Sequence, residues 1–167
     1  MKRIVLLAAA FLMVFSSYAN DPIKELMSKY KGEKGITTIN ISNGLLFLLS
    51  CVDNDDELDK MSKNLDGIRI IVDESRGEKV RFTDELKEYI AKGGYEEMIT
   101  VNEEDEKVRI LIKHNKEKIQ EMLILVDSDD ENVLVQMTGD FKLSDLGDIS
   151  GDIHIHGMEH VKDIDLK

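Results

Sequence analysis

Four short apolar segments decide the fold of this 167-residue chain: Glu97-Met-Ile-Thr-Val101, Lys107-Val-Arg-Ile-Leu-Ile-Lys113, Ile119-Gln-Glu-Met-Leu-Ile-Leu-Val126 and Val133-Leu-Val-Gln-Met-Thr138. Polar joints separate them at 102–106, 114–118 and 127–132. Short β-rich runs with joints of this length are typical of consecutive hairpins. The region 95–139 is therefore predicted to form a four-strand antiparallel meander.

The register of these strands follows from the turns, which must keep one face of the sheet apolar throughout. Turns of four, three and four residues at 103–106, 115–117 and 128–131 satisfy that condition. They pair Ile99 with Ile110, Ile110 with Met122, and Ile124 with Val135. The inner face then carries Ile99, Val101, Val108, Ile110, Ile112, Met122, Ile124, Val126, Val133, Val135 and Met137. We expect helices to cover this face, so the predicted fold is α+β, a two-layer sandwich with helices packed on one face of a largely antiparallel sheet.

The chain before this region supplies the helices and two further strands. The predicted helices begin at Asp21, Ser42 and Thr83, and the predicted strands span Ile36–Ile41 and Gly67–Val72. The helix after Ser42 is rich in Leu on nearly all sides, so we expect it to be buried on more than one side. Thr83 is expected to cap the third helix, and Gly93-Gly94 to end it.

The opposite face of the predicted meander carries a second apolar row: Met98, Leu111, Leu123, Leu125 and Leu134. A fully solvated face would not carry a continuous row of large apolar side chains, because such patches mark contacts. Two covers are open: the C-terminal tail folds back and lays Ile153 and Ile155 over the row, or a second molecule packs there. We predict cover by the tail together with a remaining interaction patch, for a protein partner or for a homo-oligomer. On this hypothesis Leu123→Lys leaves the domain folded and weakens association, whereas the same change unfolds a domain whose helices cover this face.

The N-terminal segment has the pattern of an export signal. Lys2 and Arg3 precede the apolar run Ile4–Phe15, and Ser17-Tyr-Ala19 offers small residues for cleavage. These features predict a secretory signal peptide over 1–19, and the apolar run is too short for a stable membrane anchor. We expect a single α+β domain over 20–150, a polar C-terminal tail over 151–167, and no membrane span in the mature chain.

The charge balance restricts the partners. The chain has 22 Lys and Arg residues against 34 Asp and Glu residues, a formal net charge of −12, which loss of Lys2 and Arg3 with the signal peptide takes to −14. Nucleic acids require a basic footprint, so a nucleic-acid partner is not expected. The single cysteine, Cys51, forms no internal disulfide, so stability must come from the apolar core.

Several segments together resemble a known family. They are Tyr30-Lys-Gly-Glu-Lys-Gly35, Thr37–Ser42 with the Leu-rich helix after it, Gly67–Ile71, Tyr95–Met98, Val108–Ile112, and Val133–Gly139 followed by Leu143 through Leu146. With the signal peptide, this pattern resembles the exported bacterial family described as domain of unknown function 4252. The resemblance implies a location in the periplasm or cell envelope of a Gram-negative bacterium. It implies no activity and no functional residues.

Three histidines near the C-terminus carry the one metal-binding pattern in the sequence: His154, His156 and His160. On an extended segment His154 and His156 point the same way, and His160 closes a site for a borderline divalent metal. The spacing matches none of the usual zinc patterns, so no cofactor is expected. A calcium-binding EF-hand loop needs Gly at its sixth position and Glu at its twelfth. Loops that begin at Asp53 and Asp127 have neither residue at these positions.

The sequence contains no constellation to which catalytic roles can be assigned, and no Gly-x-Ser-x-Gly elbow. We therefore expect an exported envelope protein that is a non-enzymatic binding or interaction module, with no catalytic residues. Two alternatives stay open. One is a metal-binding or sensing module that uses the histidine cluster, and the other is a small hydrolase or ligand carrier with a deep pocket.

The predicted signal peptide is directly testable. We expect cleavage after Ala19, so that protein recovered from the cell envelope begins near Asn20. Intact-mass spectrometry of the envelope fraction measures this, and a chain that still carries Met1 there would contradict the prediction.

Overall fold

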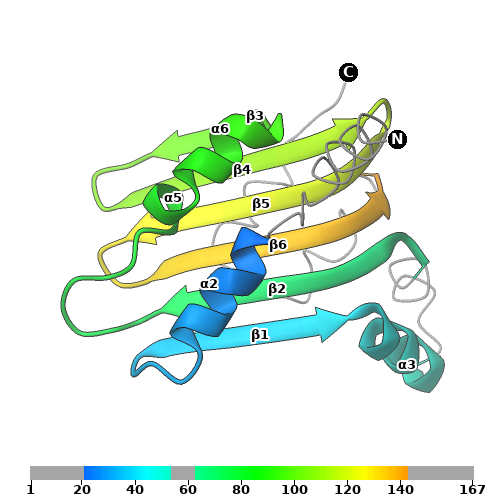
Figure 1. Ribbon diagram of the computed structural model, residues 1–167, viewed down its shortest axis with the longest axis horizontal. Helices are drawn as coiled ribbons and strands as arrows, with labels where there is room; N and C mark the ends of the chain where they lie inside the picture. Colours follow the sequence, from blue (N-terminus) through cyan, green and yellow to red (C-terminus); the bar gives the residue numbers. More distant parts are fainter. Residues whose placement is uncertain (1–20, 54–62, 143–167) are drawn as a thin grey trace, which may run out of the picture.

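One open sheet of six strands forms the centre of the molecule, and each neighbouring pair is antiparallel (Figure 1). The computed structural model describes residues 21–53 and 63–142, with side chains described up to residue 48 in the first range. The strands are β1 (Ile36–Ser42), β2 (Leu65–Asp73), β3 (Glu96–Asn102), β4 (Glu106–Asn115), β5 (Lys118–Ser128) and β6 (Asn132–Phe141). The helices are α2 (Pro22–Tyr30), α3 (Asn43–Asp53), α5 (Phe82–Glu85) and α6 (Lys87–Gly93). The architecture is mixed α/β, with strand order β1-β2-β6-β5-β4-β3, so β1 and β3 are the edges.

The predicted register is confirmed for two of the three hairpins. Ile124 faces Val135 across β5 and β6, and Ile99 faces Ile110 across β3 and β4. The predicted register of β4 with β5 was wrong by two residues: Ile110 faces Ile124 and not Met122. The turn is shorter than expected, with Lys116 in the left-handed conformation at φ 61°, and the pairing of β4 with β5 is irregular just beyond it. A shift of two residues keeps every side chain on the same face of the sheet. The prediction of which β4 and β5 residues share a face is therefore unaffected.

Helices α2, α5 and α6 cross one face of the sheet (Figure 1). Their side chains and those of the strands beneath them form one buried cluster: Ile23, Leu26, Phe82 and Leu86 with Ile71, Leu111, Leu123, Leu125 and Leu134. This is the face that the sequence analysis assigned to an exposed interaction patch, so that assignment was wrong. The central strand β5 is apolar at five consecutive positions, 122–126, so the alternation of residue types does not tell one face from the other.

The opposite face carries the row that the sequence analysis predicted as inner. Its buried side chains include Val108, Ile110, Ile112, Met122, Ile124, Val126, Val133, Val135 and Met137, with Ile99 and Val101 half-buried. From the described helices, only Leu46 of α3 joins this cluster. The helices were therefore predicted on the wrong face, although the residues of each row were grouped correctly except for Met98. The irregularity between Glu97 and Ile99 sets Glu97 opposite Leu111, and Met98 is not part of the cluster beneath the helices.

The helix ends show where local sequence signals decided the structure. Asp21 caps α2 as predicted, and its carboxylate accepts a hydrogen bond from a first-turn amide at 3.1 Å. The third predicted helix is split at Leu86 into α5 and α6, and Thr83 does not cap it. The Thr83 hydroxyl donates instead to the Asp127 carboxylate at 2.9 Å. Gly94, at φ 70°, ends α6 in the left-handed conformation that glycine adopts without strain.

Two of the predicted segments, the signal peptide at 1–19 and the polar tail at 151–167, lie outside the described residues. Within 21–53 and 63–142, no helix is both long enough and apolar enough to cross a membrane.

The helix-covered face yields the first structural prediction. Leu123 is fully buried at 0% exposure, so Leu123→Lys places an ammonium group in an apolar core without a partner. We expect the cooperative fold to be lost, because that burial costs several kcal/mol and a domain is stable by about 5–15 kcal/mol. Circular dichroism and thermal melting measure this. Met98→Lys is the control, since Met98 is 36% exposed on edge strand β3 and should keep the fold. A folded Leu123→Lys variant with an unchanged melting temperature would contradict the packing described here.

Candidate functional site

The predicted interaction patch is buried and does not form a surface. Leu111, Leu123, Leu125 and Leu134 are 0–2% exposed beneath the helices, and only Met98 remains accessible. An interaction surface must be looked for elsewhere, among the apolar side chains that the fold leaves exposed.

The exposed large apolar side chains concentrate on two consecutive elements, β1 and α3. Ile39 of β1 is 42% exposed, and Leu45, Phe47 and Leu48 of α3 are 44%, 52% and 61% exposed. Within the described residues, Met98 on the opposite edge is the one other side chain of this kind. We call the exposed part of Ile36–Leu48 the β1–α3 surface.

The local sequence explains this placement. β1 is rich in β-branched residues, and it pairs with β2 along its whole length. Asn43 then turns the chain into α3, and its side-chain amide donates to the Leu65 carbonyl at 2.8 Å, which fixes the start of α3 to the start of β2. Figure 1 shows α3 beyond the end of β1, away from the other helices. Leu46 points inward at 4% exposure, so its neighbours Leu45 and Leu48 are left outside the core.

The β1–α3 surface is also free of charge. From Ile36 to Val52 the sequence contains no Asp, Glu, Lys, Arg or His, although such charged residues make up 34% of the chain even without counting His. The first turn of α3 contains no acidic residue. An exposed segment with many apolar side chains and no charges is unusual on a soluble surface, and it indicates a contact.

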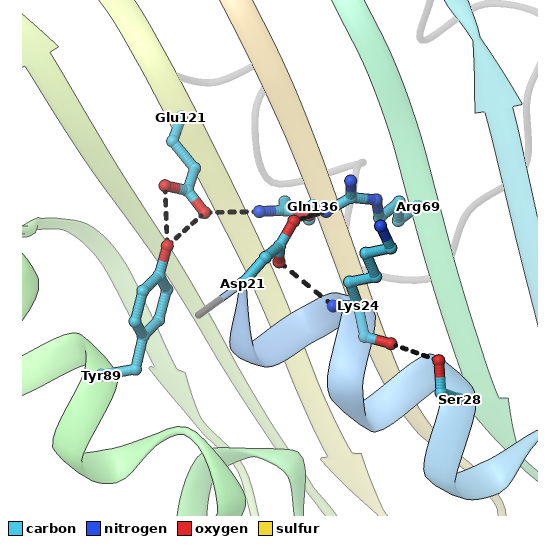
Figure 2. Close-up of polar contacts among 7 residues, drawn as sticks. All are labelled: Asp21, Lys24, Ser28, Arg69, Tyr89, Glu121 and Gln136. Atoms are coloured by element: carbon cyan, nitrogen blue, oxygen red, sulfur yellow. Dashed lines mark hydrogen bonds and ion pairs between the residues drawn. The ribbon is translucent and has the colours of Figure 1, made fainter. Parts of the chain in front are cut away.

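A chain of polar side chains lies beneath the helices and fastens them to the sheet (Figure 2). The Tyr89 hydroxyl of α6 lies 3.1 Å from both carboxylate oxygens of Glu121, which also accepts from Gln136 Nε2 at 2.6 Å. Arg69 Nη1 donates to Gln136 Oε1 at 3.0 Å and pairs with Asp21 Oδ2 at 2.5 Å. Because Asp21 caps α2, this polar chain connects both helices with β5, β6 and β2.

The electrostatics of this polar chain suit a structural role. Burial raises the pKa of the Tyr89 hydroxyl, and the neighbouring Glu121 charge raises it further. Burial likewise raises the pKa of Tyr95, whose buried hydroxyl lies beside Tyr89 and Glu121 without the geometry of a hydrogen bond. A general acid or base works best with a pKa near the ambient pH, so these shifts take both hydroxyls away from proton transfer.

An open cleft of about 1540 Å³ lies at one end of the sheet, between the loop before α5 and the β3–β4 and β5–β6 turns. Most of its charged lining residues are acidic: Glu78, Asp84, Glu85, Glu88, Glu103, Glu104, Asp105, Glu106, Asp127 and Asp129. Within 21–53 and 63–142, no group of three or more His, Cys, Asp or Glu side chains is arranged to hold a metal ion. Glu121, Gln136 and Arg69 do not border the cleft.

Two further sites were considered from the sequence, the histidine cluster and the acidic runs. His154, His156 and His160 lie outside the described residues, so the histidine cluster stays a prediction. The acidic run Asp127–Glu131 ends β5 and forms the hairpin turn to β6, which its Asp and Ser residues favour. In that turn the Ser128 hydroxyl donates to the Glu131 carbonyl at 2.6 Å.

Sequence reasoning missed the β1–α3 surface, although one signal for it was available. The absence of charge from Ile36 to Val52 stands out in so charged a chain. The prediction used only the Leu-rich pattern of the helix after Ser42, which indicated burial on more than one side, and the exposure of Leu45 and Leu48 shows that prediction to be wrong for this part of α3.

Most of the chain matches the model of a known protein family. Residues 30–149 match the family described as Domain of unknown function (DUF4252), and this range contains strands β1 to β6. No curated protein and no solved structure matches the chain.

The polar chain yields a prediction about stability. Gln136→Leu removes the bridge between Arg69 and the 9% exposed Glu121, so a buried carboxylate loses its shortest hydrogen bond. We expect the free energy of unfolding to fall by about 2–3 kcal/mol in urea titration. Lys92→Gln is the matched control, because the Lys92–Glu88 pair is exposed to solvent and its loss should leave the free energy of unfolding nearly unchanged. If Gln136→Leu and the unsubstituted protein have equal free energies of unfolding, the row of polar side chains from Tyr89 to Asp21 does not hold the helices on the sheet.

Proposed function

Since this chain belongs to the DUF4252 family, whose description names no activity, we propose from its surface that it is a non-enzymatic interaction module. In this proposal it binds a protein through the β1–α3 surface. The observation that supports it is the concentration of exposed apolar side chains on an uncharged segment of a strongly acidic chain.

The energetics favour a contact at this surface. Burial of a Leu side chain is worth about 1.5–3 kcal/mol when it goes from fully exposed to fully buried. Leu45 and Leu48 are about half exposed, so their burial against a partner would supply part of that free energy at each position. No charged side chain between Ile36 and Val52 would have to be desolvated at the same time, which removes the largest cost of forming an interface.

The polar groups of the domain support the non-enzymatic part of the proposal. Glu121, the carboxylate with the most hydrogen bonds beneath the helices, is engaged by Tyr89 and Gln136 and lies away from the cleft lining. Its partners hold α2 and α6 in place, so its chemistry is used inside the fold. The acidic side chains at the cleft line an open surface and not an enclosed pocket of the kind that small ligands occupy.

We also propose that the protein is exported and acts in the periplasm or cell envelope, on the basis of the signal-peptide pattern at 1–19.

We further propose that the fold is a two-layer sandwich with a four-strand meander over 95–139. Helices on one face of the sheet and the sequential pairing of β3 to β6 support them. The metal-binding alternative rests on His154, His156 and His160, and a thermal shift with zinc, copper or nickel distinguishes it.

A photo-crosslinking experiment tests the proposed surface. A photoreactive phenylalanine derivative is placed at Leu48 in one variant and at Met98 in a control, and each full chain is expressed and irradiated in the cell. Both positions are exposed, but only Leu48 lies on the β1–α3 surface. We expect a reproducible protein adduct from position 48, identified by mass spectrometry, and none from position 98. The absence of any protein adduct at 48 above the level at 98 would contradict the proposed function.

A further inference from the structure

The two edges of the sheet differ in how they are protected against pairing with another strand. An edge strand exposes unpaired backbone groups, and proteins usually block such an edge with charges, bulges, proline or a covering element. The edges here are β1 and β3, so each can be examined for these features.

Edge β3 is protected. It begins with Glu96 and Glu97, and its pairing with β4 is interrupted by an irregularity between Glu97 and Ile99. The Glu97 carboxylate forms an ion pair with Arg109 at 2.7 Å, which keeps charge on this strand. A strand that joined β3 would have to accommodate the irregularity and bury a charged pair.

Edge β1 itself carries no charge, no proline and no bulge. Its sequence, Ile-Thr-Thr-Ile-Asn-Ile-Ser, contains no charge, no proline and no glycine. It pairs with β2 in seven consecutive positions without a register shift, so its outer side is regular. Uncharged segments of this length with high β-propensity and no proline are the ones that pair readily with further strands.

We propose that β1 pairs antiparallel with β1 of a second copy of this chain, around a two-fold axis at Ile39, to join the two sheets into one. This inference rests on the proposed function, since it names the partner of the same surface. Pairing through a strand edge supplies main-chain hydrogen bonds, and a two-fold axis makes the same patch serve both copies.

The sequence of β1 is complementary to itself about Ile39. In that register Ile39 lies opposite Ile39 of the second copy, Thr38 opposite Asn40, and Thr37 opposite Ile41. The central pair is apolar, Thr38 and Asn40 can hydrogen-bond, and Thr37 can meet Ile41 through its methyl group. No pair sets like charges opposite each other. The exposed leucines of α3 continue the uncharged surface past the end of the strand.

The charge distribution permits a second copy at this surface. A formal net charge of −12 on each copy opposes association, and this repulsion is weakest where the two copies meet through uncharged segments. The region Ile36–Val52 is such a segment in both copies. A basic or acidic peptide would find no opposite charge here, and its own charges would be desolvated without compensation.

A pair of single-cysteine variants tests the register. Cys51 is first replaced by Ser, so that Ile39→Cys or Thr37→Cys carries the one thiol in the full chain. In the proposed register two residues 39 face each other at about 4.5–5.5 Å between Cα atoms, within the range of a disulfide. Two residues 37 are offset by four positions, about 14 Å along the strand, which is out of range. With diamide as oxidant, we expect rapid dimer formation by Ile39→Cys and not by Thr37→Cys.

Sedimentation equilibrium gives the second measurement. Ile39→Lys sets two ammonium groups opposite each other at the axis, and we expect the dimer dissociation constant to rise at least about tenfold. Met98→Lys is the matched control on the other edge and should leave that constant unchanged.

The outcomes separate this inference from the proposed function. A chain that is monomeric at all concentrations, or a dimer whose disulfide forms equally at 37 and 39, overturns pairing at Ile39. If position 48 still crosslinks to a different protein, the interaction module stands and the second copy is the wrong partner. If position 48 crosslinks to no protein, the proposed function fails as well.

Discussion

Burial of the central strand β5 on both of its faces is the constraint on which the rest of the structure depends. Residues 122–126 are all apolar and at most 1% exposed, so each face of the sheet needs apolar neighbours. On one face α2, α5 and α6 meet this need through Ile23, Leu26, Phe82 and Leu86. At up to about 3 kcal/mol for each fully buried side chain, these contacts dominate the stability of the domain. The polar chain from Tyr89 to Asp21 then fixes where on that face two of the helices lie.

The same constraint explains why the two ends of the sheet differ. The central strands have neighbours on both sides, whereas β1 and β3 each have one. β3 ends the sheet with glutamates and an irregular pairing, and β1 ends it with a regular, uncharged strand. In a chain with so many charged residues, an uncharged edge followed by an apolar helix supports the proposed contact at β1 and α3.

Much of this fold was predictable from the sequence, because the determining signals are local. The Asp21 cap, the strand segments and two of the three hairpin registers follow from cap residues, β-branched runs and turn lengths. The register of β4 with β5 was missed because Lys116 adopts a left-handed conformation that its residue type does not indicate. The face covered by helices, and with it the site, could not be predicted, because apolar residues occupy both faces and only long-range packing distinguishes them.

Hydrogen exchange at the two edges tests most directly the central claim that β1 forms the contact surface by pairing with β1 of a second copy. The amide protons of β1 and β3 are followed by mass spectrometry at a low and a high concentration of the protein. The account predicts that exchange in β1 slows as concentration rises, because its outer amides become paired, while exchange in β3 stays the same. Exchange in β1 that is independent of concentration, or that slows equally in β3, would contradict it.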